Sequence, residues 1–78
     1  MERRTTSRKP VLMSAAIAFP GNSVDCLVRD ISISGAAIDI GNRHDIPERF
    51  DLVFKVDGTL IPCHVVWRQD EQLGVAFD

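Results

Sequence analysis

Apolar and polar residues alternate with a period of two along most of the chain, and turn residues separate the alternating segments. Successive side chains of a strand point to opposite faces, so this period predicts strands with one buried face. No segment carries the apolar stripe of an amphipathic helix. The pattern predicts six strands, over residues 11–19, 23–31, 36–40, 50–56, 59–68 and 72–77. In residues 11–19 alanines fill both faces and weaken the alternation, so a short helix between Pro10 and Pro20 is the competing prediction there.

The turn signals between these segments indicate how the strands are connected. Pro20-Gly21-Asn22 marks a turn, and Asp57-Gly58 is typical of a hairpin between antiparallel strands. Short strands at near-regular spacing favour a closed sheet. The sequence therefore predicts an all-β fold, a small six-stranded antiparallel β-barrel.

Alternation also predicts which side chains face the interior. Leu52, Phe54 and Val56 are expected to point inward together. Trp67, the only tryptophan, is expected to pack in the core or on the barrel rather than to stack on a ligand.

The chain has 78 residues, enough for one domain, and its basic charge is concentrated at the N-terminus. Four of the nine Lys and Arg residues lie within the first nine positions, which are otherwise polar. We expect a flexible basic arm over residues 1–9 and the barrel over residues 10–78. The net charge of −2 argues against a general nucleic-acid binder, so any anion site should involve the arm.

Other residue types predict little further chemistry. Cys26 and Cys63 are expected to be reduced thiols, and no C-x-x-C or H-x-x-x-H spacing indicates a metal site or a cofactor. Cys63 and His64 are strand neighbours that point to opposite faces, so we expect no nucleophile–base pair and no enzyme.

The first 20 residues have the outline of a secretory signal peptide, but Glu2 and a run diluted by alanines weaken it. No segment approaches the roughly 18 apolar residues of a membrane-spanning helix. A cytoplasmic protein without a membrane span is therefore expected.

The segment Asp30-Ile31-Ser32-Ile33-Ser34-Gly35 reads as a strand that enters a tight polar turn. A period of two places Asp30 and Ser32 on one face and the two isoleucines on the other. Gly35 permits a positive φ or a close approach to the backbone. Local chemistry leaves a hairpin turn and a binding site both open.

The pattern Arg4-x-x-x-Arg8 followed by Asp30-x-Ser32-x-x-Gly35 resembles the signature of PilZ domains, bacterial receptors for the second messenger cyclic di-GMP. The end of the chain, residues 65–77, is similar to the close of a PilZ barrel. The resemblance implies that Arg4 and Arg8 bind guanine and phosphate and that Asp30 and Ser32 complete the site, with Gly35 letting the ligand lie against backbone. Arg3 is an expected helper at the same site.

The resemblance further implies a receptor that relays the messenger level to a partner protein, and two alternatives stay open beside it. One is a PilZ-like adaptor that binds a protein and not the nucleotide. The other is a small barrel that binds single-stranded nucleic acid, which needs aromatic residues along a strand face. With four Phe, one Trp and no Tyr, mostly at apolar positions, a nucleic-acid polymer is not the expected partner.

Overall fold

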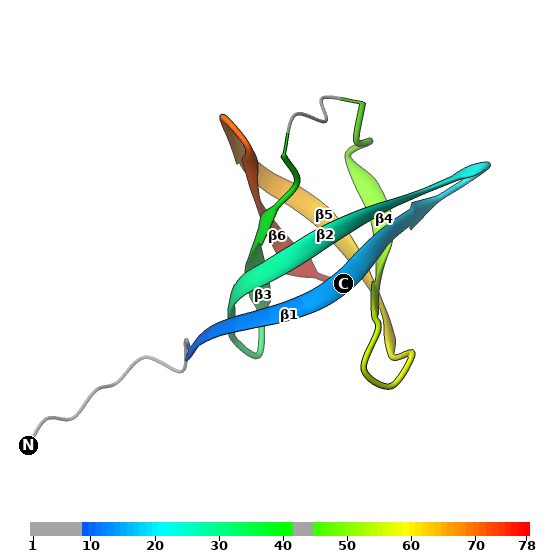
Figure 1. The fold of residues 1–78 in the computed structure, drawn as a ribbon. Helices are drawn as coiled ribbons and strands as arrows, with labels where there is room; N and C mark the ends of the chain where they lie inside the picture. The colour runs from blue at the N-terminus through cyan, green and yellow to red at the C-terminus, as the bar shows by residue number, and fades with distance from the viewer. Residues whose placement is uncertain (1–8, 42–44) are drawn as a thin grey trace, which may run out of the picture.

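The computed structural model of the chain describes residues 9–41 and 45–78, with side chains from residue 12 onward. Neighbouring strands are antiparallel and close into a barrel in the order β1-β2-β3-β6-β5-β4, as Figure 1 shows. The strands are β1 (Lys9–Phe19), β2 (Asn22–Ile31), β3 (Gly35–Asp39), β4 (Arg49–Phe54), β5 (Leu60–Gln69) and β6 (Gln72–Phe77). The all-β, six-stranded antiparallel barrel predicted from the sequence is confirmed. The described ranges contain no helix that is long and apolar enough to cross a membrane.

The core is the inside of the barrel, and every strand supplies it through alternate residues. In β2, for example, Val24, Cys26 and Val28 are buried whereas their neighbours are exposed. The largest completely enclosed side chains come from all six strands, one from each. Burial of each such Leu or Ile contributes about 1.5–3 kcal/mol. The six enclosed side chains are Ile17, Ile38, Leu52, Leu73, Val28 and Cys63.

Two side chains leave the pattern that strict alternation predicts. Val56 was expected to face inward with Leu52 and Phe54, yet it is 78% exposed because β4 ends at Phe54. Ile33 was expected to share the face of Ile31, yet it is 90% exposed because β2 ends at Ile31. Both predictions were wrong for the same reason, since a period of two holds only while the strand continues.

Three breaks in the strand register bend the sheet. The pairing shifts between Pro10 and Met13 in β1, between Val28 and Asp30 in β2, and between Val65 and Trp67 in β5. Each break is a β-bulge, in which extra residues on one strand face fewer on its partner. A bulge re-aims the side chains that follow it, so the residues next to these three breaks do not follow the alternation of the rest of their strand.

The loop between β4 and β5 is held by the carboxylate of Asp57. Its Oδ1 atom accepts a hydrogen bond of 2.9 Å from the Thr59 backbone N–H, while Gly58 adopts a φ of 75°. This backbone hydrogen bond lowers the pKa of Asp57 below its ordinary value of 3.8, since it favours the charged form.

The loop should therefore lose stability in acid. A lowered pKa in the folded state adds stability above pH 3.8, which disappears as the pH falls through the folded-state value. We expect the wild type to melt above Asp57→Asn at pH 7, and the difference to shrink towards pH 2. Asp57→Asn keeps an acceptor oxygen and does not titrate, so it isolates the charge. A difference in melting temperature that stays constant over this range would contradict the account.

The two thiols are free and enclosed, with Cys26 9% and Cys63 1% exposed. Burial raises the pKa of Cys26 to about 12 and that of Cys63 to about 11, because a thiolate is poorly solvated inside the barrel. We expect a thiol reagent at pH 8 to label the folded protein far more slowly than the protein in urea, where two thiols should react. Rapid labelling of the folded protein, or fewer than two thiols after unfolding, would contradict this.

Candidate functional site

The turn between β2 and β3 is built by Ser32 and closed by Gly35. The Ser32 N–H donates to the Gly35 carbonyl at 2.8 Å, and the Ser32 hydroxyl donates to the same oxygen at 3.3 Å. The Ser34 N–H donates to Ser32 Oγ at 3.3 Å, and the two serine hydroxyls lie 3.3 Å apart. Ser34 is exposed and Ser32 half-buried, so the turn presents two neighbouring hydroxyl groups at the barrel surface.

Gly35 starts β3 where that strand runs directly against β6. A Cβ atom there would clash with the carbonyl oxygen of Val75 and lie 3.3 Å from the Cα of Ala76. Its φ is not positive, so the glycine is needed for the close approach of two backbones. The Phe77 N–H donates to the Ser34 carbonyl at 2.8 Å and fixes the other side of the turn to β6.

The register of β1 and β2 brings the N-terminal end of the barrel to this turn. Lys9 pairs with Ile31, and Pro10 pairs with Asp30. Figure 1 shows the start of β1 and the β2–β3 turn at the same end of the barrel. Lys9, the first described residue, therefore lies across from Ile31 in the segment Asp30–Gly35.

Asp30 is half-buried at this point and carries no counter-charge among the described residues. Some other aspartates on the described barrel are paired, for example Asp25 with Lys55 at 2.7 Å and Asp39 with Arg29 at 2.8 Å. No hydrogen bond or ion pair within residues 9–41 and 45–78 engages the Asp30 carboxylate. An unpaired carboxylate is suited to accept hydrogen bonds from a ligand.

Trp67 forms a wall beside the turn. Its side chain is 40% exposed, on the outside of β5, and it lies over Gly74 of β6. An open hollow of about 260 Å³, here called the Trp67 hollow, is lined among others by Ser32, Ser34, Gly35, Val66, Trp67 and Gly74. The expected packing of Trp67 holds for its contact with Gly74, while the exposed part of the ring faces the hollow.

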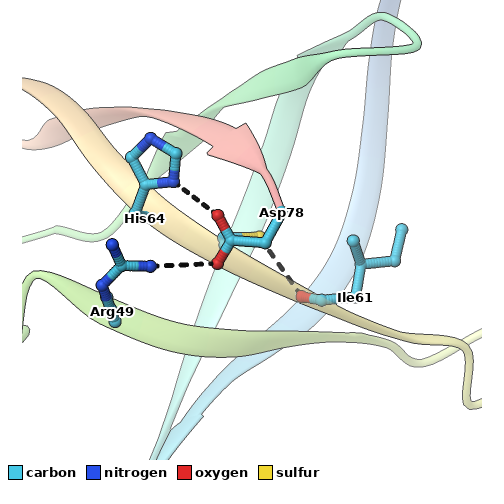
Figure 2. A network of polar contacts seen from close by, with 5 residues as sticks. Arg49, Ile61, His64 and Asp78 are labelled. Atoms are coloured by element: carbon cyan, nitrogen blue, oxygen red, sulfur yellow. Dashed lines mark hydrogen bonds and ion pairs between the residues drawn. The ribbon is translucent and has the colours of Figure 1, made fainter.

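A second polar cluster, shown in Figure 2, has a structural explanation. The Asp78 carboxylate lies 2.6 Å from His64 Nδ1 and 3.4 Å from Arg49 Nη1, and this ties the end of β6 to β5 and β4. Cys63 is enclosed, and its Sγ donates to the Ile61 carbonyl at 3.3 Å. Cys63 and His64 thus use opposite faces of β5, so they form no nucleophile–base pair.

Other parts of the described barrel surface give less support for a binding site. A hollow of about 500 Å³ lies beside this cluster, lined among others by Arg49, Asp51, Pro62 and Asp78. It is larger than the Trp67 hollow but contains none of the motif residues. Among the residues the structure describes, no three His, Cys, Asp or Glu side chains gather as a metal site would require.

The structure joins Ser32 and Gly35 by hydrogen bonds within one turn. Asp30 lies two residues before Ser32, in β2, outside the lining of the Trp67 hollow. The arginines Arg3, Arg4 and Arg8 lie outside the described residues. The sequence analysis did not predict that Trp67 lies beside Ser32 and Gly35. Gly74 was the sequence feature that indicated this contact, because a glycine inside a strand often marks the close approach of another group.

Comparison with known proteins agrees with this geometry. A family model of the PilZ domain matches residues 2–78, essentially the whole chain. The match covers both the segment that carries the arginines and the Asp30–Gly35 turn. No curated protein gave a significant match. With the barrel, the turn and the family match in agreement, the chain belongs to the PilZ domain family.

Proposed function

We propose that this PilZ domain is a receptor for cyclic di-GMP, bound at the β2–β3 turn by the turn residues, the arm and Trp67. The observation that supports the proposal is the register of β1 and β2, which pairs Lys9 with Ile31 and Pro10 with Asp30. Arg8 directly precedes Lys9 in the sequence, and Arg4 lies four residues before Arg8. The arginine half of the motif therefore joins the barrel at the end that carries the Asp30–Gly35 half. The proposed ligand residues are Arg3, Arg4, Arg8, Asp30, Ser32, Gly35 and Trp67.

The chemistry of these residues matches the ligand. Cyclic di-GMP offers two phosphates, and each guanine presents the acceptors O6 and N7 on one edge. A planar arginine fork fits either group with two hydrogen bonds. The opposite guanine edge carries N–H donors, which match the unpaired carboxylate of Asp30. The Ser32 and Ser34 hydroxyls supply donors for a phosphate oxygen.

Trp67 adds an aromatic surface to this set. Bases stack on aromatic side chains, and the exposed part of the Trp67 ring lines the same hollow as the two serines. The Trp67 hollow is open to solvent on the outside of the barrel, so a base reaches it without any rearrangement of the core.

The proposal has a regulatory part as well. Bound cyclic di-GMP changes how the domain contacts a partner protein, and the exposed apolar side chains of Ile33 and Val66 lie at or next to the site for such a contact. Because the ligand is a bacterial intracellular messenger, the proposal places the domain in the bacterial cytoplasm.

The arginines give the first test. Each bidentate contact to guanine or phosphate is worth about 1–3 kcal/mol, so Arg4→Ala and Arg8→Ala should each weaken cyclic di-GMP binding by about ten- to a hundredfold in calorimetry. Lysine at either position should rescue poorly, since it keeps the charge but lacks the fork. Arg3→Ala should cost clearly less.

Arg49→Ala is the matched control for these variants, because it removes the same charge from the Asp78 cluster. It should bind like the wild type. GTP and a short oligonucleotide should give no comparable heat. A folded wild type that does not bind cyclic di-GMP at tens of micromolar, about −6 kcal/mol, would leave the protein-only adaptor as the better function.

Asp30 gives a second test, in which net charge and hydrogen bonding predict opposite changes in affinity. Removal of a negative charge near an anionic ligand should strengthen binding if only net charge matters. If Asp30 accepts from guanine, Asp30→Ala should instead weaken binding by about ten- to a hundredfold, since hydrogen bonds to a charged group are worth about 1.5–3 kcal/mol.

Asp25→Ala on the same strand is the control for Asp30→Ala, because Asp25 points outward and pairs with Lys55. Melting curves of both variants report any change in the fold. Tighter binding by Asp30→Ala than by the wild type would refute the base-reading role.

A further inference from the structure

Gly74 lies at an outward position of β6 and is nevertheless buried. Its cross-strand partner is Trp67, the residue that follows the bulge in β5. A Cβ atom on Gly74 would lie 2.7 Å from Trp67 Cδ1 and closer still to Nε1 and Cε2. The five-membered part of the indole therefore occupies the space that a side chain would take.

The contact differs in kind from the one at Gly35. A side chain at Gly35 would meet the backbone of β6, which cannot move without breaking the pairing of β3 with β6. A side chain at Gly74 would meet the Trp67 ring, a side chain that is 40% exposed and takes no part in the backbone pairing of the sheet. The φ of Gly74 is not positive, so its backbone accepts an alanine.

We infer that Gly74 is a positioning residue for the ligand site. Because it leaves room for the indole against β6, Gly74 lets Trp67 line the Trp67 hollow together with Ser32, Ser34 and Gly35. This inference rests on the proposed binding of cyclic di-GMP and adds a residue that acts through Trp67. An aromatic ring seated in advance loses less freedom when a base stacks on it.

Four proteins test the inference: the wild type, Gly74→Ala, Trp67→Ala and the double variant. Affinity for cyclic di-GMP is measured by calorimetry and stability by thermal melting. We expect Gly74→Ala and Trp67→Ala each to weaken binding by about tenfold, which is within the range for loss of one base–aromatic stack. Gly74→Ala in the Trp67→Ala background should have no further effect, because the ring it displaces is absent.

The emission of Trp67 gives a readout that needs no ligand. It is the only tryptophan, so its spectrum reports on this contact alone. Gly74→Ala should shift the emission to longer wavelength and make it more accessible to a soluble quencher. If Gly74→Ala does not fold by itself, removal of the ring in the double variant should restore folding, which supports the contact; no restoration would overturn it.

The outcomes separate the two proposals. A wild type without affinity for cyclic di-GMP overturns the proposed function, and the emission shift then still decides whether Gly74 seats Trp67. An unchanged emission in Gly74→Ala overturns the inference. So does wild-type affinity in Gly74→Ala, or an equal loss on Gly74→Ala with and without Trp67.

Discussion

A sheet of only six strands closes into a barrel when it bends sharply, and this barrel bends at three bulges. All three border the candidate site. The bulge in β1 follows Pro10, the bulge in β2 precedes Asp30, and the bulge in β5 precedes Trp67. A bulge turns the next side chain away from the alternation of its strand. The same irregularities that let the sheet close thus place a carboxylate and an indole on the outer surface.

The site therefore lies outside the core, on a rigid support. Ser32 and Ser34 are held by hydrogen bonds within the turn, and the turn is bound to β6 through the Phe77 N–H. Elsewhere on the described surface, Asp25, Asp39 and Asp78 each have a cationic partner. The Asp30 carboxylate has no hydrogen bond or ion pair among the described residues, so it is available to the ligand proposed above.

Two glycines inside strands are needed for different reasons. Gly35 permits β3 and β6 to approach each other and so belongs to barrel closure. Gly74 permits the Trp67 side chain to lie on β6, and in the proposal above it serves the ligand site. The difference lies in the atoms that a methyl group would meet, a fixed backbone carbonyl in one case and a partly exposed ring in the other. Neither position uses the positive φ for which glycine is usually kept.

The sequence by itself determined the strands, the barrel class and the motif, because alternation and turn residues are local properties. The expected strands lie within a few residues of those observed, and Asp57-Gly58 marked the turn before β5. The direction of Trp67 was decided by the tertiary structure alone. Cys63 and Val65 point inward, and continued alternation would place Trp67 beside them, but pairing with β6 skips a residue and turns the ring outward. The position of Lys9 opposite Ile31 is likewise a matter of register. Register and bulges depend on the partner strand, and a single strand's pattern carries no information about its partner.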